Sequence, residues 1–400
     1  MPIDPRPFLF REPPMESPTT SRRRLLQLGA AALPLAALGP VLPSVPARAA
    51  GAPAGLTMPA ETDAHVRTYM AWPALSRVWG SGGLADVRAD IAGVAYEISR
   101  FEPVVVLARP GQAADARYQC GRGARHAIDV IEIPVDDLWI RDFGPTFLAG
   151  PGAVAGVDTN FNGWGKAGTR YAQPYANDAA AAGILLGEYA VNRVRAGFTG
   201  EGGSLETDGE GTLLATVSSL VNPNRNPGMT QQQVEQELKT ALGIEKVIWA
   251  PGLAGADITD CHIDCLARFT APGKVILDRP GPDTDPKWVA VYEETKKVLR
   301  DATDARGRRL AVTELPGPDR TKITGRGTEF LSSYTNYYTP NGAVIAPRFG
   351  DAAADAAARS ILQAAYPGRE VVQIVIDGIA SGGGGIHCAT QSHPAVPPAV

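Results

Sequence analysis

Three short segments of the chain carry residue types that can do chemistry, and the first of them ends in Cys388. This cysteine follows a run of four glycines, Gly382 to Gly385, and His387 precedes it directly. Adjacent glycines cost conformational entropy and add no packing, so they are typical of a backbone that turns tightly or approaches a ligand closely. A cysteine at the end of such a loop is a candidate nucleophile. The alternative is a small buried hydrophobic residue, which is the commoner role of a lone cysteine.

The second segment, Asp260 to Phe269, places His262 two residues before Asp264. On a strand, the two side chains would share one face about 6–7 Å apart. A histidine and a carboxylate on one face suit an acid–base group beside a binder of cations. A histidine held by a structural carboxylate fits the same spacing equally well.

The third segment has Trp139 three residues before Asp142, ahead of a Gly144-Pro145 turn that must end any helix. An indole face and a carboxylate together suit a planar guanidinium, which stacks on the first and forms paired hydrogen bonds with the second. A structural ion pair between Arg141 and Asp142 is the alternative.

A metal site competes with these interpretations, because six residues offer suitable ligand atoms: Cys261, His262, Cys265, His387, Cys388 and His393. However, the spacing of Cys261 and Cys265 is not the tight spacing of structural zinc sites. On a strand the two residues would lie about 13 Å apart, too far for a shared metal or a mutual disulfide. Phosphate-binding and dinucleotide-binding fingerprints are missing as well. The sequence therefore predicts no metal and no nucleotide cofactor.

The elements that must position these residues form a mixed α/β fold. The expected strands are residues 103–107, 247–249, 310–313, 343–345 and 371–376. A capping box at Thr230 and Gln233 begins a helix that Gly243 ends, and Asp285-Pro286 begins a second helix. Residues 352–365 form an alanine-rich third helix. No long linker interrupts residues 51–400, which we interpret as a single domain.

Composition and charge exclude several classes of function. The chain has 400 residues, of which 44% are hydrophobic and 20% charged, and this is typical of a globular protein. Residues 51–400 carry 32 basic and 39 acidic residues, a net charge of −7 that argues against nucleic acid as a partner. Four cysteines are too few for a disulfide scaffold.

Residues 1–50 have the features of an export signal. Arg22, Arg23 and Arg24 precede a mildly apolar run, and Ala47 and Ala49 offer small residues for cleavage. The apolar run is too short for a membrane span, and no later stretch is long enough either. We expect a twin-arginine-type signal and a periplasmic or extracellular protein. A basic, alanine-rich tail is the alternative.

Taken together, the three segments resemble the agmatine deiminase family, which includes bacterial peptidylarginine deiminases. Other blocks follow in the family's order from residue 57 to about residue 394: Met58 to Glu61, Met70 to Pro73, Phe161 to Gly165, Glu201 to Ser204, Asp208 to Thr212, Asn222 to Pro227, Ser333 to Tyr338, and Pro347 to Asp351. The resemblance implies a pentein fold, a five-bladed pseudo-symmetric α/β propeller around a central active site.

The resemblance also implies hydrolysis of a guanidine C–N bond without metal or organic cofactor. The nucleophile would be Cys388 and the general acid and base His262. Asp142 and Asp264 would pair with the guanidinium, with Trp139 beside it, and Asn336 occupies a position where the family often has a polar residue near the site. The reaction would pass through a covalent thiouronium intermediate and release ammonia.

The substrate implied is a small cationic guanidine. Agmatine, giving N-carbamoylputrescine, is the first hypothesis, and peptidylarginine or free arginine, giving citrulline, is the second. A third is an exported guanidine- or polyamine-binding protein without turnover. Two positions depart from the family: Cys261 replaces a glycine before the histidine, and Ile258 replaces an acidic residue that agmatine enzymes place near the substrate amine. The sequence indicates neither an oligomeric state nor a role for Cys120, Cys261 and Cys265, whose disulfide state stays open.

Overall fold

Five small sheets carry the fold in this computed structural model, which describes residues 51–396 and residue 398. Four of the sheets share one pattern, in which two antiparallel strands are followed by a third strand parallel to the second. These sheets are β15 (Gln391–Pro394), β1 (His65–Ala71) and β2 (Val104–Ala108); β4 (Thr146–Gly150), β5 (Ala153–Asp158) and β6 (Asn192–Arg195); β7 (Glu206–Thr207), β8 (Thr212–Thr216) and β9 (Lys246–Ala250); and β10 (Ala267–Ala271), β11 (Lys274–Arg279) and β12 (Ala311–Pro316).

The fifth sheet is a reduced version of the same unit. Its strands β13 (Ala343–Pro347) and β14 (Glu370–Ile374) are parallel. A single antiparallel bridge between Tyr338 and Ile345 stands where the other sheets have their first strand. The first sheet is instead extended by β3 (Ile128–Glu132), which is parallel to β2. The five-bladed arrangement expected from the resemblance is therefore confirmed.

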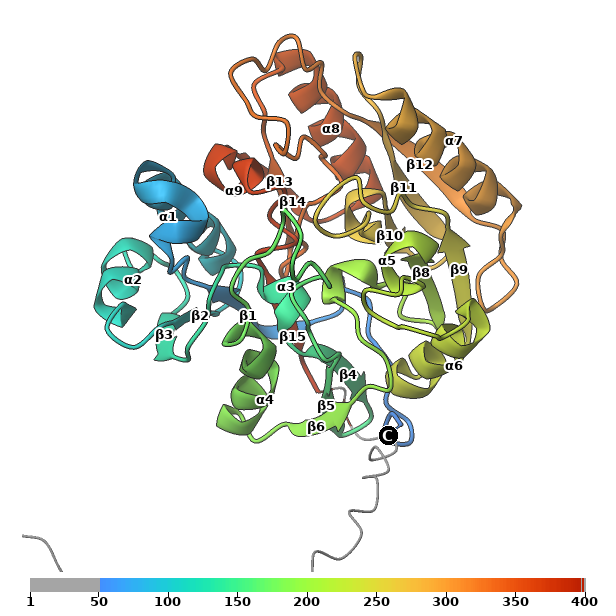
Figure 1. Cartoon of the computed structure of the whole chain (residues 1–400), viewed down its shortest axis with the longest axis horizontal. Helices are drawn as coiled ribbons and strands as arrows, with labels where there is room; N and C mark the ends of the chain where they lie inside the picture. The colour runs from blue at the N-terminus through green and yellow to red at the C-terminus, as the bar shows by residue number, and fades with distance from the viewer. Residues whose placement is uncertain (1–50, 397, 399–400) are drawn as a thin grey trace, which may run out of the picture. The chain divides into compact units, whose positions relative to one another are not determined.

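A helix connects the parallel strands of each unit. Figure 1 shows the longer of these helices around the outside, with the short helix α3 (Ile140–Phe143) near the centre. The connecting helices are α1 (Ser76–Ser99), α4 (Asp178–Glu188), α5 (Val217–Leu220) with α6 (Gln231–Leu242), α7 (Pro286–Asp301) and α8 (Ala352–Ala365). The remaining short elements are α2 (Ala113–Cys120), α9 (Asp377–Ser381), and the 3₁₀ turns η1 (Gly202–Ser204) and η2 (Ile263–Cys265).

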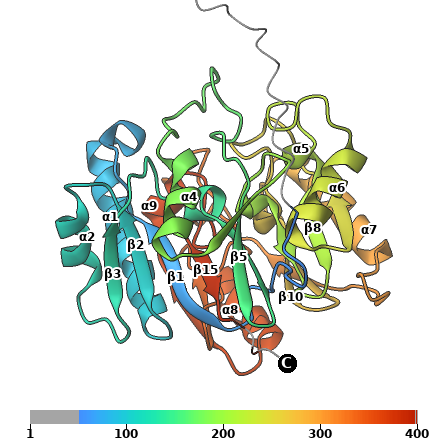
Figure 2. The ribbon, with the colours of Figure 1, turned by 90° about the horizontal axis from the view of Figure 1, so that it is seen from below.

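The two ends of the described chain meet in the first sheet. Strand β15 pairs antiparallel with β1, with Tyr69 opposite Gln391, and Figure 2 shows the two strands side by side. Because Cys388 lies three residues before β15, this pairing fixes the candidate nucleophile beside the first sheet.

The helices and strands that local sequence signals predict are present in the structure. Helix α6 begins with the capping box of Thr230 and Gln233, and it ends at Gly243 in the left-handed conformation. Its apolar residues are buried in the second core cluster: Val234, Leu238, Ala241 and Leu242. Asp285 caps α7 through the backbone N–H of Lys287. The five expected strands correspond to β2, β9, β12, β13 and β14.

The stretch around His262 and Asp264 is not a strand, so the shared strand face considered from their spacing does not apply. His262 precedes the 3₁₀ turn η2, and the strand β10 begins only at Ala267. Buried polar groups dominate this stretch, and the chain folds locally to satisfy them instead of pairing as a strand. The two side chains are brought together by this turn and not by the alternation of a strand.

Residues 1–50, where the export signal is expected, lie outside the described residues. Among the described helices, none combines the length and apolar character required to cross a membrane.

Candidate active site

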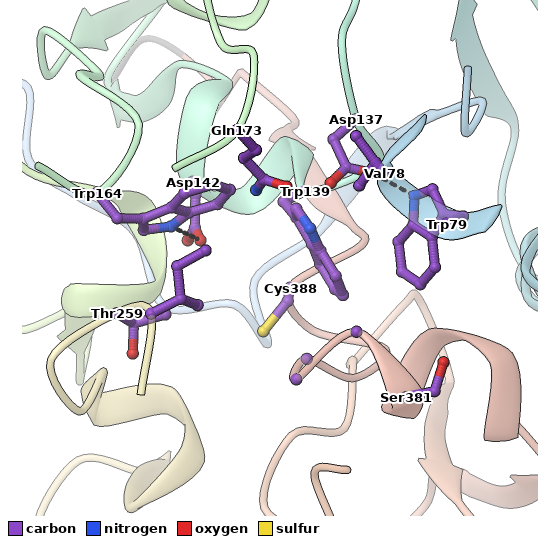
Figure 3. A pocket seen from close by; sticks show the side chains of 14 residues that line it. Val78, Trp79, Asp137, Trp139, Asp142, Trp164, Gln173, Thr259, Ser381 and Cys388 are labelled. Atoms are coloured by element: carbon purple, nitrogen blue, oxygen red, sulfur yellow. Dashed lines mark hydrogen bonds between the residues drawn. The ribbon is translucent and has the colours of Figure 1, made fainter. Parts of the chain in front are cut away.

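A cavity of about 260 Å³ opens beside Cys388 (Figure 3). Its wall combines three indoles, Trp79, Trp139 and Trp164, with the carboxylates of Asp137 and Asp142. None of the described residues that line it is an arginine or a lysine. Such a wall suits a planar cation, because the indole faces and the carboxylates both attract positive charge.

The glycine run packs tightly around this cavity. A side-chain carbon at Gly384 would lie 2.3 Å from the Trp139 ring, and one at Gly382 would lie 2.3 Å from the Trp79 ring. At Gly385 it would lie 2.5 Å from Asn336 Oδ1. The close approach expected from the sequence is therefore an approach of the backbone to the side chains that form the site.

Asp142 projects from α3 and is held by two donors. The Trp164 indole N–H donates to Oδ2 at 2.8 Å, and the Gly203 backbone N–H donates to Oδ1 at 3.1 Å. Burial raises the pKa of Asp142 and the nearby His262 lowers it, while Asp264 and Glu201 raise it further, so the pKa is about 6. The carboxyl group is therefore mostly ionised at neutral pH.

Asp264 is fully buried and lies between His387 and Cys388. Its Oδ2 is 2.7 Å from His387 Nδ1 and 3.6 Å from Cys388 Sγ. Burial raises the pKa of Asp264, but the hydrogen bond and charge of His387 outweigh burial and lower the pKa to about 2. The other nitrogen of His387 is 2.8 Å from Glu61 Oε2. His387 thus fixes the orientation of Asp264.

His262 has one anchored and one free ring nitrogen. Nε2 lies 3.2 Å from Glu201 Oε2, whereas Nδ1 is buried, forms no hydrogen bond with the described residues and lies 3.6 Å from Asp142 Oδ1. Glu201 is itself held by the guanidinium of Arg225. Burial lowers the pKa of His262, but the charges of Asp142, Glu201 and Asp264 outweigh it and raise the pKa to about 9. The ring is therefore protonated at neutral pH, with Nδ1 available as the acid.

Cys388 lies among groups that control its thiol. The Asn336 amide donates to Cys388 Sγ at 3.2 Å and to Cys265 Sγ at 3.3 Å, and its Oδ1 accepts from the Cys388 backbone N–H. Contact with Cys265 lowers the pKa of Cys388, but burial and the charges of Asp264 and Asp142 leave it above its ordinary value. A cation bound between the two carboxylates would oppose these charges and favour the thiolate.

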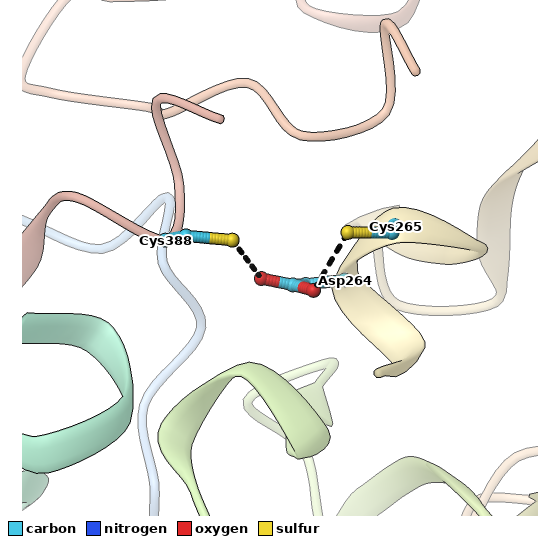
Figure 4. A group of neighbouring side chains, drawn as sticks. All are labelled: Asp264, Cys265 and Cys388. Carbon is cyan, nitrogen blue, oxygen red and sulfur yellow. Dashed lines mark hydrogen bonds between the residues drawn. The ribbon is translucent and has the colours of Figure 1, made fainter. Parts of the chain in front are cut away.

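Asp264, Cys265 and Cys388 form a group of three potential metal-ligating side chains whose ligand atoms lie within 4.8 Å of one another (Figure 4). The other residues considered as metal ligands do not join this group. Cys261 packs in the third core cluster, and His393 stacks on Phe147 with ring centres 4.6 Å apart. All four cysteines of the chain are free thiols.

The backbone conformation at Cys261 explains why other members of the family have glycine at this position. Its φ is +70°, in the left-handed region that favours glycine, and Asp260 before it has a φ of +59°. The position therefore suits glycine for a conformational reason, and the cysteine accepts this conformation while its side chain packs in the core. The backbone leading to His262 keeps the geometry that a glycine would give.

The structure brings the predicted site residues to one place. Trp139, Asp142 and Cys388 line the cavity. His262, Asp264 and Asn336 lie directly behind this surface through the contacts described above. A further set of residues orients them, although the sequence suggested no such role for any of the set and indicated His387 only as a potential metal ligand: Glu61, Trp164, Glu201, Gly203, Arg225 and His387. The signal for part of this set was the Glu201-Gly202-Gly203 block, since paired glycines after an acidic residue mark a tightly packed backbone.

Comparisons with known proteins agree with this geometry. The model of the Porphyromonas-type peptidyl-arginine deiminase family matches residues 57–394. The agmatine deiminase of Pseudomonas aeruginosa (strain LESB58) is 39% identical over 359 residues, covering 85% of this chain and 96% of the relative. The agmatine deiminase of Medicago truncatula is 37% identical, covering 86% and 97%. The solved structure of the agmatine deiminase of Enterococcus faecalis superposes with a TM-score of 0.78 at 31% identity, covering 85% of this chain and 96% of that one.

Proposed function

The chain belongs to the Porphyromonas-type peptidyl-arginine deiminase family, and from this premise we propose that it is a cysteine hydrolase that converts agmatine to N-carbamoylputrescine and ammonia. Relatives named as agmatine deiminases at 37–39% identity over most of the chain support agmatine as the substrate.

The charge of the cavity wall is the observation that carries this proposal. Carboxylates and indoles line the cavity beside Cys388, and no arginine or lysine is found among the described lining residues. Agmatine carries two positive charges and no carboxylate, so it matches this wall. Free arginine carries an α-carboxylate that would find no counter-charge among the lining residues, which disfavours it as a substrate.

The substrate guanidinium is held by Asp142 and Asp264. Their carboxylates accept hydrogen bonds from its N–H groups, and this orients the central carbon toward Cys388 Sγ. The positive charge of the guanidinium offsets the two carboxylates and stabilises the thiolate, which is the attacking form. The Asn336 amide, which lies 3.2 Å from Sγ, stabilises the same charge.

The first half of the reaction forms a covalent intermediate. The thiolate forms a C–S bond, and a tetrahedral carbon results. His262 donates the proton at Nδ1 to the departing nitrogen, because an amide anion is too basic to leave. Ammonia departs, and the carbon stays attached to Cys388 as a thiouronium.

The second half of the reaction releases the product. Neutral His262 removes a proton from water, and the resulting hydroxide adds to the thiouronium carbon. The tetrahedral species then collapses: the C–S bond breaks, its electron pair returns to sulfur, and the hydroxyl proton passes to solvent as the C=O bond of the product forms. The ureido product leaves, the thiolate is restored and His262 is protonated again. Glu201 keeps the ring of His262 oriented through both halves, since it binds Nε2.

The test is ureido-product formation by the purified protein, with agmatine, free arginine and an arginine peptide offered in parallel. We expect turnover of agmatine and loss of at least about 10⁴-fold in kcat for Cys388→Ala, the scale of a lost nucleophile. Preferred turnover of the peptide or of arginine would move the assignment to an arginine deiminase. Binding of agmatine without any turnover would favour a binding protein.

We also propose export through the twin-arginine-type signal in residues 1–50. The test replaces Arg22 and Arg23 together by lysine in the full chain. The wild-type protein should reach the periplasm or the medium, and the variant should stay in the cytoplasm with its deiminase activity unchanged. Equal distribution of the two proteins would refute this proposal and leave the enzymatic one intact.

A further inference from the structure

Asp137 is a second buried carboxylate in the wall of the cavity. Its Oδ1 accepts hydrogen bonds from the Trp79 indole N–H at 2.8 Å and from the Leu138 backbone N–H at 2.9 Å. Its Oδ2 accepts none from the described residues, although the Trp139 side chain lies near enough to the carboxyl group to lower its pKa. The residue is only 1% exposed. A buried carboxylate oxygen with no partner is costly, and such a group at a cavity is typical of a binding site.

The charge around Asp137 is not balanced by the protein. Burial raises the pKa of Asp137 to about 6 in spite of its hydrogen bonds, and the neighbouring Asp136 raises it as well. The carboxyl group is thus mostly ionised at neutral pH. Arg109 pairs with Asp136, whereas no described lysine or arginine pairs with Asp137. The position therefore attracts a cation from solution.

Figure 3 shows the Trp139 indole between Asp137 and Cys388. One end of the cavity thus holds the reacting sulfur and Asp142, and the other holds Asp137. The indole between them offers an apolar face to a short methylene chain. Ile258, which also lines the cavity, adds a second apolar group.

We propose that Asp137 binds the primary ammonium of agmatine while Asp142 and Asp264 hold its guanidinium. The inference rests on the proposed function, and it makes Asp137 the residue that distinguishes a diamine-like guanidine from a simple alkylguanidine. An α-carboxylate in place of the ammonium would meet the charge of Asp137 and be repelled.

The test compares the binding of two ligands to the full chain carrying Cys388→Ala, which removes chemistry. The ligands are agmatine and 1-pentylguanidine, in which a methyl group replaces the ammonium. We expect agmatine to bind about 10- to 100-fold more tightly than pentylguanidine, and Asp137→Asn to remove this preference by weakening agmatine alone. Calorimetry measures the four dissociation constants.

The amide that replaces the carboxylate in Asp137→Asn keeps an oxygen for the Trp79 and Leu138 donors, so the positions of the indoles are preserved in this variant. Asp208→Asn is the matched control, because Asp208 is also buried, also has an Oδ2 without a hydrogen-bond partner among the described residues, and does not line the cavity. It should leave the ratio of the two affinities unchanged. Equal weakening of both ligands by Asp137→Asn, or agmatine binding that is unaffected, would overturn the inference.

The parent protein gives an answer even where Asp137→Asn does not fold, since equal affinity for the two ligands would by itself refute a site for the ammonium. The outcomes also separate the two proposals. Agmatine binding that depends on Asp137, without conversion by the wild-type enzyme, would refute the proposed function alone. Conversion of agmatine with binding that does not depend on Asp137 would refute only the role of Asp137.

Discussion

At the scale of single residues, the division of labour between the two nitrogens of His262 decides how the site works. Glu201 holds Nε2, and Nδ1 is left free beside Asp142. The charges of Asp142 and Glu201 raise the pKa of His262 to about 9, which keeps the ring in the acid form that the proposed mechanism requires. The same carboxylates therefore orient the acid and set the pH at which it is lost.

This arrangement predicts the effect of Glu201→Gln. The amide keeps the shape of the side chain but removes one of the charges that hold the His262 pKa high. We expect the alkaline limb of the kcat/KM profile to move to lower pH and kcat to fall about 10- to 100-fold, as for other orienting partners of catalytic groups. Turnover of agmatine between pH 6 and pH 10 measures both effects.

Glu210→Gln is the control, because Glu210 is exposed and pairs only with Arg308 at the surface. An alkaline limb that stays in place in Glu201→Gln would show that Glu201 does not set the protonation of His262. A fall in kcat alone would then indicate a purely structural contribution to the site.

A second prediction concerns Cys265, whose thiol lies close to that of Cys388. The two sulfurs lie within 4.8 Å, and a disulfide requires about 2.05 Å, so a modest movement joins them. With oxidised glutathione, one thiolate forms a mixed disulfide and releases glutathione. The other thiolate then displaces the second glutathione. We expect loss of activity that dithiothreitol reverses, and a protein mass lower by two hydrogens.

The Cys265→Ser variant should instead keep one glutathione on Cys388, since no neighbouring thiol can displace it. Mass spectrometry of the oxidised proteins distinguishes the two products. Cys120→Ser, which changes a buried cysteine at the end of α2, should behave as the wild type does. A stable glutathione adduct on the wild-type protein would contradict the prediction.

The residues proposed to react stand out in the sequence, whereas most of those that orient them do not. Cys388, His262, Asp142 and Asp264 stand in distinctive local patterns. Glu201 contacts His262 across 61 residues of sequence, and although its Glu-Gly-Gly block marks a tightly packed backbone, it does not indicate His262 as the partner. Asp137 was visible as part of an acidic pair, but its unpartnered oxygen depends on where Trp79 and Leu138 place their donors.

At the scale of elements, short turns position the chemistry while strands and helices support it. Asp142 lies on a single helical turn, α3, and Gly203 on the turn η1. A side-chain carbon at Gly203 would lie 2.6 Å from His262 Nδ1 and 2.7 Å from Asp142 Oδ1. Only glycine lets η1 approach closely enough to donate to Asp142.

Gly203→Ala should therefore push the side chains of His262 and Asp142 apart. We expect kcat/KM for agmatine to fall by about 100-fold, since a displacement near 1 Å has that effect, and stability to fall by about 1–3 kcal/mol from overpacking. Steady-state kinetics and urea denaturation measure the two effects.

Gly93→Ala provides the matched control. Gly93 is exposed on α1, and a side-chain carbon there meets no atom within 4 Å. This substitution should leave kcat/KM unchanged and stabilise the protein by about 0.5–1 kcal/mol. Unaltered catalysis in Gly203→Ala would show that η1 can move away without cost to the site.

The elements themselves were predicted unevenly, for a physical reason. Helices α6, α7 and α8 carry their own start signals and an apolar stripe, so local sequence determines them. The turn η2 is determined by the buried partners of Asp260, His262 and Asp264, which come from distant segments. The conformation of such a segment depends on contacts with distant residues, so its own sequence does not predict it.

At the scale of the whole described molecule, the pairing of the first and last strands is linked to the charge of the candidate active site. Pairing of β1 with β15 places Cys388 next to residues from the other sheets, and it buries several carboxylates around one histidine. Burying like charges together is unfavourable unless a cation joins them. His262 in its protonated form is such a cation, so the protonation of this histidine stabilises the fold as well as the site.

The stability of the protein should therefore depend on pH through His262. Its pKa is about 9 in the folded protein and about 6.5 when exposed to water, so the folded state keeps a proton that the unfolded chain releases. This contribution is complete below pH 6.5 and is lost as the pH rises toward 9.

The comparison of the wild type with His262→Gln isolates this contribution. Burial raises the pKa of Asp278 to about 7, so Asp278 also titrates at the lower end of the pH range. It does so in both proteins alike, and the comparison removes its effect. Urea denaturation between pH 7 and pH 9.5 should show the wild type losing about 2–3 kcal/mol more than His262→Gln. Parallel curves for the two proteins would mean that the buried carboxylates are balanced by groups other than this imidazolium.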